Sequence, residues 1–208
     1  MQIGISIEPY LVVEKARLTQ YIENIVQLSR KLGKSQVALH FDYFKPNPDI
    51  FQLVQSYADQ IDIDLHLMQT SVPSVAGFRS VALDVVDVDK KSAVNLSSVD
   101  VNRRGLVLDL GCDLAGYEDL IRTASYFIVM TVKCGKSGQT FNPSALQLIP
   151  QIRRLNSKAV IIVDGGVNDE NILLLKQVGV DVAVVGNYAK KCYENGSLEA
   201  GINRLLHD

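Results

Sequence analysis

Eight short apolar runs alternate with segments of helical periodicity along the 208 residues of the chain. Most runs are rich in Val and Ile, which is typical of strands buried in a parallel sheet. Parallel strands need long crossovers, so eight such units predict an α/β protein with a closed (βα)8 TIM barrel; a doubly wound open sheet is the alternative. The apolar runs are residues 2–7, 36–41, 61–67, 81–88, 105–110, 126–132, 159–163 and 182–185. The helical segments include residues 18–32, 48–58, 143–155, 170–178 and 198–206.

The length of the chain suits one large domain. No Pro/Ser-rich, highly charged or low-complexity segment divides it, so we expect a single barrel domain over residues 1–208. Two segments predict poor helices, because residues 69–80 contain Pro73 and Gly77 and residues 90–104 are polar and irregular. We expect the third and fourth helices to be short or distorted.

Charge and cysteine content narrow the choice of partners. The 21 basic and 23 acidic residues give a net charge of −2, which offers no broad attraction for nucleic acid or an anionic membrane. Cys112, Cys134 and Cys192 show no CxxC spacing, so they predict neither a disulfide framework nor a thiolate zinc site. The amino terminus lacks a signal-peptide pattern, and no stretch reaches the roughly 18 apolar residues of a membrane span. We expect a cytoplasmic protein that binds a small molecule.

Two of the three histidines and two aspartates stand at predicted strand ends. His40 and Asp42 lie in ALHFD, His66 in DLHLM and Asp164 in IIVDGG. Residues two apart on a strand point to the same side, and TIM barrels place their active sites at the carboxyl edge. Imidazole and carboxylate together suit Zn, Fe, Mn or Co. The set predicts four ligands for one divalent metal ion of unknown identity, although each residue alone also fits a structural role. His207 is expected to be solvated.

Glycines recur in the loops after the sixth, seventh and eighth predicted strands. Such loops often bind phosphate through backbone N–H groups and a helix amino terminus. Three of them in successive units predict a phosphorylated ligand. We expect Lys136, in the same region, to be mostly solvated. The glycines are Gly135, Gly138, Gly165, Gly166 and Gly186.

With these motifs the chain resembles the ribulose-phosphate 3-epimerases and their hexulose-phosphate relatives. The similarity is strongest in the last third of the chain. The resemblance implies a TIM barrel of the ribulose-phosphate-binding type. It also implies an isomerase of the pentose phosphate pathway that interconverts D-ribulose 5-phosphate and D-xylulose 5-phosphate. The matching stretches are IGISI at 3–7, HFD at 40–42, HLM at 66–68, VMTVKCGKSGQTF at 129–141, VDGGVN at 163–168 and VVGN at 184–187.

The resemblance also implies a role for each site residue. One of Asp42 and Asp164 would remove the proton at C3, and the other would return a proton to the opposite face. The enediolate formed between these steps carries negative charge that a divalent metal ion can neutralise. Ser6, Met68 and Met130 would contact the substrate, as would His66, and Asn187 stands where the family usually has serine.

The chain departs from the family after Asp42. It continues YFKPN at 43–47, about four residues shorter than usual, and we expect Phe44 to replace part of the lost apolar wall. Three hypotheses stay open: a pentulose-phosphate epimerase, the same chemistry on another ketose phosphate such as a hexulose 6-phosphate, and a non-catalytic sugar-phosphate-binding barrel. Retention of Ser6, both histidines and both aspartates favours an enzyme. The resemblance further leads us to expect a homo-oligomer.

Overall fold

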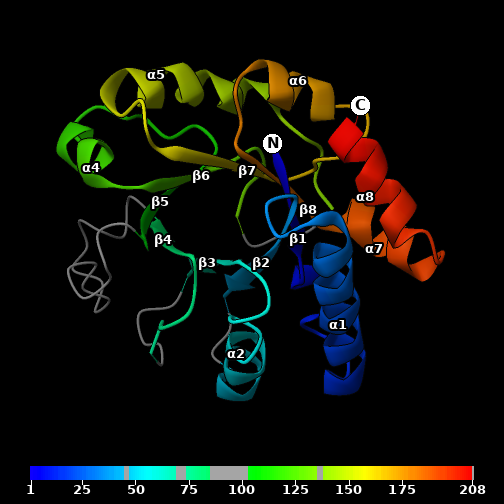
Figure 1. Cartoon of the computed structure of the whole chain (residues 1–208). Coiled ribbons are helices and arrows are strands. Elements are labelled where there is room, and N and C mark those ends of the chain that lie inside the picture. Colours follow the sequence, from blue (N-terminus) through cyan, green and yellow to red (C-terminus); the bar gives the residue numbers. More distant parts are fainter. Residues whose placement is uncertain (45–46, 69–73, 85–102, 135–137, 208) are drawn as a thin grey trace.

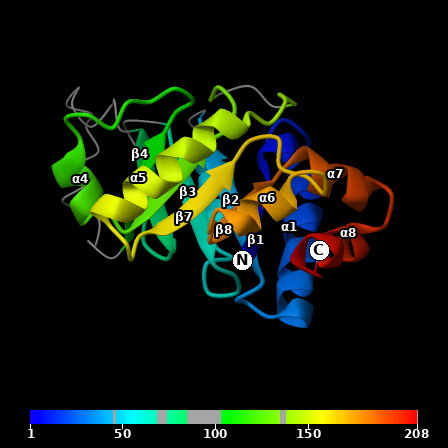
Figure 2. The ribbon, with the colours of Figure 1, turned by 90° about the horizontal axis from the view of Figure 1, so that it is seen from above.

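The protein is described by a computed structural model that covers residues 1–44, 47–68, 74–84, 103–134 and 138–207. Within these residues, eight parallel strands close into a barrel in chain order, and β8 pairs with β1. Helices surround the barrel (Figure 1), as the view from above also shows (Figure 2). The predicted (βα)8 barrel is therefore confirmed, and the open doubly wound sheet is wrong.

The strands lie where the apolar runs predicted them, with small shifts at their ends. Their bounds are Gln2–Ser6 (β1), Val37–Tyr43 (β2), Ile63–Leu67 (β3), Ser80–Asp84 (β4), Arg104–Leu108 (β5), Tyr126–Met130 (β6), Val160–Asp164 (β7) and Val182–Val185 (β8). The helices are Lys15–Leu32 (α1), Pro48–Gln55 (α2), Glu118–Thr123 (α4), Leu148–Leu155 (α5), Ile172–Gln177 (α6), Asn187–Glu194 (α7) and Leu198–His207 (α8). Short 3₁₀ turns cover Glu8–Tyr10 (η1) and Pro143–Gln147 (η4). Of the two segments expected to form poor helices, residues 69–73 and 90–102 lie outside the described residues. Residues 74–79 contain no helix, and Ser80 begins β4.

Local sequence explains where the helices begin and end. In α1, Leu18, Ile22 and Ile25 recur at helical spacing and are fully buried against the barrel. The helix ends at Gly33, whose φ of 104° suits glycine. In α2, the Asn47 side chain accepts a hydrogen bond from the N–H of Ile50, an N-cap that fixes the first turn.

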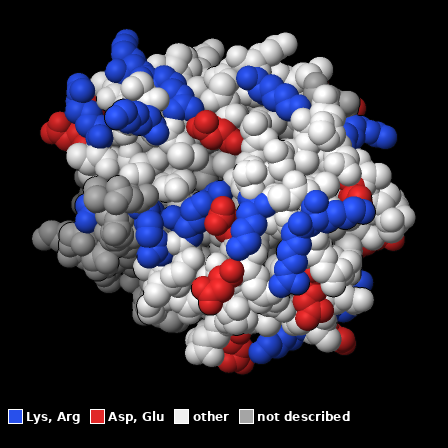
Figure 3. Space-filling view, viewed as in Figure 1, with Lys and Arg blue, Asp and Glu red and all other residues white. Residues whose placement is uncertain are grey.

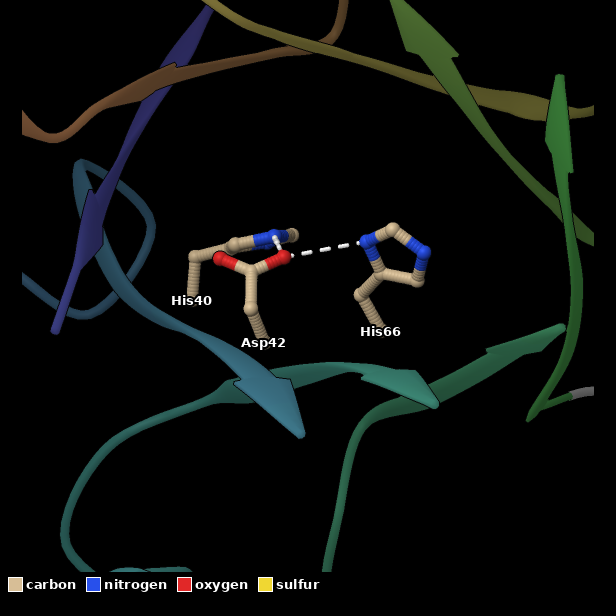
Figure 4. Close-up of side chains that lie close together, drawn as sticks. All are labelled: His40, Asp42 and His66. Carbon is tan, nitrogen blue, oxygen red and sulfur yellow. Dashed lines mark hydrogen bonds and ion pairs between the residues drawn. The ribbon is translucent and has the colours of Figure 1, made fainter. Parts of the chain in front are cut away.

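Alternate residues of each strand face the helices or the barrel interior. On β2, Phe41 faces outward and packs against the ring of Phe51 on α2, at 6.0 Å between centroids. Its neighbours His40 and Asp42 point inward (Figure 4). The interior is divided: β1, β2 and β3 supply polar residues, whereas an apolar cluster comes from β4 to β8. That cluster contains Ala82, Val107, Ile128, Met130, Val132, Ile162, Val182 and Val184.

A polar network fills the amino-terminal end of the barrel interior. Asp64 on β3 is 1% exposed, and it accepts hydrogen bonds from Arg79 Nε at 2.9 Å and Ser80 Oγ at 2.6 Å. Arg79 also bonds to the Gln2 side chain at 2.6 Å. A buried carboxylate is costly unless it is paired and hydrogen-bonded, and Asp64 is both. Asp64 stands opposite His40 in strand register and two residues before His66 on the same face of β3, so this network directly adjoins the candidate site.

The surface carries both signs of charge. On the face shown in Figure 3, Lys and Arg side chains are interspersed with Asp and Glu. Among the described helices, none is long and apolar enough to cross a membrane.

Candidate active site

Three side chains converge at the carboxyl ends of β2 and β3. His40, Asp42 and His66 each offer a ligand atom, and these atoms lie within 4.8 Å of one another. Strand pairing produces the cluster, because Asp42 stands opposite His66 in the β2–β3 register while His40 lies two residues back on the same face. All three point into the barrel interior (Figure 4). Both histidines are fully buried, with 0% and 1% exposure.

Asp42 is held on both of its carboxylate oxygens. Its Oδ1 forms a hydrogen bond with His66 Nδ1 at 3.0 Å, and its Oδ2 accepts one from Ser6 Oγ at 3.4 Å. Ser6 in turn accepts the backbone N–H of Glu8 at 3.1 Å. The serine at the end of β1 therefore orients the carboxylate at the end of β2.

His40 is the group in the site whose hydrogen-bonding capacity is unmet. Neither of its ring nitrogens has a hydrogen-bond partner among the described residues, although Asp42 Oδ1 lies 3.4 Å from Nε2. A buried polar atom without a partner is costly, and an imidazole lone pair can be satisfied by a metal ion. The convergent His, Asp and His donors and this unsatisfied imidazole fit a divalent cation of the borderline kind.

The fourth predicted ligand, Asp164, lies at the end of β7. Its Oδ2 is 3.7 Å from His40 Nε2, and its side chain is 16% exposed, more than that of Asp42. Asp164 is not part of the three-residue group that converges within 4.8 Å. The two carboxylates approach the His40 ring from strands separated in the barrel by β8 and β1.

The two carboxyl groups have opposite pKa shifts. Burial alone would raise the pKa of Asp42, but His40 and His66 beside it hold the pKa well below its usual range. Burial and the negative charge of Asp42 raise the pKa of Asp164 to about 6. Burial lowers the pKa of His40, but the carboxylates of Asp42 and Asp164 outweigh it and raise that pKa to about 9. Asp42 is thus a stable carboxylate and Asp164 a stronger base.

A cavity of about 850 Å³ opens above this cluster. Two methionines and Phe44 contribute apolar lining, and residues of the loops after β6, β7 and β8 also line the cavity. The predicted residues that line it are Ser6, Asp42, Met68, Met130, Gly138, Asp164, Gly165, Gly166, Gly186 and Asn187. His40 and His66 are not among the residues that line it, and Gly135 and Lys136 fall outside the described residues.

The glycines of this wall also have a packing role. A Cβ added at Gly166, where φ is +64°, would lie 2.6 Å from the backbone nitrogen of Phe141. At Gly138 it would come within 3.6 Å of the Asn187 side chain. The loops after β6, β7 and β8 therefore pack closely on one another.

Two lysines are among the cavity residues that sequence reasoning missed. Lys191 lines it from α7, one helical turn after Asn187, and Lys133 lines it from the loop after β6. The signal for Lys191 was its spacing of four from Asn187, which becomes visible only once a helix is predicted after Gly186.

Similarity searches with the sequence point to one family. The ribulose-phosphate 3 epimerase family matches residues 39–189, well over half of the chain. A ribulose-phosphate 3-epimerase of Aquifex aeolicus is 34% identical over 89 residues, which are 41% of this chain and 40% of that protein. One from Buchnera aphidicola (subspecies Schizaphis graminum) is 27% identical over 168 residues, 72% of this chain and 74% of the relative. The first of these matches thus spans only about two fifths of the relative's length.

Solved structures give the same fold at low sequence identity. The 3-hexulose-6-phosphate synthase of Salmonella typhimurium superposes with a TM-score of 0.65 at 11% identity, over 99% of this chain and 96% of the other. A thiamine phosphate pyrophosphorylase of Pyrococcus furiosus gives 0.60 at 14% identity, over 98% and 93%. The resemblance expected from the strand-end motifs is confirmed by the family match: the chain belongs to the ribulose-phosphate 3 epimerase family.

Proposed function

We propose that the protein is a metal-dependent ketose-phosphate 3-epimerase that interconverts D-ribulose 5-phosphate and D-xylulose 5-phosphate. The observation that carries the proposal is the pair of carboxylates on β2 and β7, which face one cavity from separate strands. Asp42 and Asp164 lie 3.4 and 3.7 Å from the same nitrogen of His40. A protein that only bound sugar phosphate would need the glycine loops but not two opposed carboxylates.

The two carboxyl groups have complementary roles in proton transfer. One removes the C3 proton, the electron pair passes into the neighbouring carbonyl to form an enediolate, and the other carboxylic acid returns a proton to the opposite face of C3. Environments that separate two pKa values, as those of Asp42 and Asp164 do, are typical of such acid and base pairs. Ser6 and His66 keep Asp42 aligned through their hydrogen bonds.

A divalent cation held by His40, Asp42, His66 and Asp164 would supply positive charge to the cavity in which the enediolate forms. The unsatisfied nitrogens of His40 support this assignment. Met68 and Met130 would exclude water from the reacting carbons. Gly138, Gly166, Gly186 and Asn187 would bind the phosphate, with further N–H groups from the start of α7.

Substitution of each carboxylate tests the proposal. D42N and D164N keep the size of the side chain but cannot accept the proton, so we expect each to lower kcat by about 100- to 10,000-fold. Conversion of D-ribulose 5-phosphate would be followed with a coupled assay on metal-loaded protein. The matched control is D119N, which replaces an exposed aspartate in the first turn of α4. Wild-type turnover in D42N or D164N would contradict the two-base assignment.

A longer ketose phosphate is the second candidate. The segment after Asp42 is short, Phe44 lines the cavity, and about 850 Å³ leaves room for one more carbon. Assay of a hexulose 6-phosphate beside the pentulose phosphate distinguishes the two, since the better substrate has the higher kcat/KM. That the chain forms a single domain, is a homo-oligomer and is cytoplasmic stays a prediction.

A further inference from the structure

We propose that Thr131 is a positioning residue that holds Asp164 in place through the backbone of the loop after β7. The proposal goes beyond the proposed function, which assigns Thr131 no role, but its kinetic test rests on that function. Thr131 follows the last residue of β6 and is fully buried.

Every polar group of Thr131 is used to join neighbouring segments. Its N–H donates to the carbonyl of Asp164 at 2.8 Å, and its carbonyl accepts the N–H of Asn142 at 3.0 Å. Its hydroxyl donates to the carbonyl of Asp164 at 3.0 Å and also contacts the carbonyl of Gly165. The Thr131 side chain therefore links the end of β6 to the end of β7 at Asp164.

The loop that Thr131 joins contains two successive glycines. Gly165 and Gly166 have φ values of +116° and +64°, and glycine explores such conformations more freely than other residues do. Neither glycine has a side chain that restricts its backbone angles, so the direction of the carbonyls beside Asp164 depends on the contacts that they make. The hydroxyl of Thr131 contacts the backbone carbonyls of Asp164 and Gly165.

The two carboxylates are therefore held in different ways. Asp42 is oriented through its side chain by Ser6 and His66. For Asp164, the backbone carbonyl is fixed by Thr131, and the side chain follows the backbone. Loss of the Thr131 hydroxyl should disturb Asp164 and leave Asp42 unchanged.

If Thr131 positions only Asp164, T131V should affect the two epimers differently, whereas a general loss of stability would affect both equally. T131V removes the hydroxyl with little change in volume, and we expect the conversion rate to fall about 10- to 100-fold, since misplacement by about 1 Å costs that much. In D₂O, the epimer whose proton faces Asp42 should still take up deuterium at C3 at close to the wild-type rate. The other epimer, which depends on Asp164 to remove its proton, should lose exchange and conversion together. KM should change little.

Three further variants separate positioning from structure. T131S retains the hydroxyl and should restore the wild-type behaviour. V129A removes packing from a fully buried residue on the outward face of β6, two residues before Thr131, so it should lower thermal stability without any difference between the two epimers. T123V removes a threonine hydroxyl that bonds within α4 and should have no effect on either rate.

A crystal structure of T131V provides a test that needs no substrate. We expect the Gly165 carbonyl to turn and the Asp164 carboxylate to move, while Asp42 stays on Ser6 and His66. An unmoved Asp164, or equal loss of exchange from both epimers, would overturn the proposal. If the wild-type protein exchanged neither epimer, the proposed function would fail instead, and the position of Asp164 in T131V would by itself decide the role of Thr131.

Discussion

Replacing Gly165 with alanine tests how tightly the loop after β7 is packed. The φ of Gly165 is +116°, and a residue with a Cβ in this backbone conformation destabilises the fold by about 1–3 kcal/mol. The added Cβ would also lie 2.6 Å from Val132 Cγ2 and 2.9 Å from Thr131 Oγ1, and overpacking of this kind costs a further 1–3 kcal/mol or so. We therefore expect G165A to lower the free energy of unfolding by about 4 kcal/mol.

The matched control is Gly179. It also has a positive φ, +78°, but a Cβ there would meet nothing within 4 Å. G179A should therefore lose only the conformational part, about 1–2 kcal/mol. In thermal unfolding followed by circular dichroism, a chain of this length should lose about 8–16 °C for G165A and about 2–8 °C for G179A. Equal losses would refute the argument that packing between the loops demands a glycine at 165.

Three further predictions concern the site. S6A removes the hydrogen bond to Asp42 and should lower kcat/KM about 3- to 10-fold in steady-state kinetics; an unchanged value would show that Ser6 does not orient the carboxylate. K191M should raise KM for the sugar phosphate about 3- to 10-fold, most at low salt, because Lys191 lines the cavity near the proposed phosphate position; K158M is the exposed control, and equal effects of the two would contradict the contact. A divalent cation at 100 times its Kd should stabilise the protein by about 2.7 kcal/mol in thermal unfolding, and H40A should lose this increment; a shift retained in H40A would place the cation elsewhere.

The fold was predictable because strand sequence and barrel closure obey simple rules. The Val- and Ile-rich runs gave all eight strands, and the two-residue period correctly placed His40 and Asp42 on one face. The predicted end of β2 at Phe41 was two residues short, because the strand continues through Asp42 to Tyr43. A polar residue that points into a barrel does not end a strand, and hydropathy alone does not show this.

The parts that escaped prediction depend on contacts between distant segments. The Arg79–Asp64 network joins residues 15 apart, and its position follows from the alignment of β3 with β4. The hydroxyl of Thr131 reaches Asp164 across 33 residues for the same reason. α7 was not among the helical segments named from the sequence; Asn, Lys and Glu make up half of its eight residues. Predicting such features requires the strand register and the loop conformations, which local sequence patterns do not supply.

Proton exchange at C3 tests the central claim most directly. Metal-loaded protein would be incubated in D₂O with D-ribulose 5-phosphate, and deuterium at C3 and the formation of D-xylulose 5-phosphate would be followed by NMR. Removal of the C3 proton by one aspartate and return of a proton by the other predict that deuterium enters C3 as the epimer forms. D42N and D164N should each slow epimer formation by about 100- to 10,000-fold. Absence of both deuterium and epimer, with metal occupancy confirmed, would contradict the assignment of pentulose-phosphate epimerase activity to this cavity.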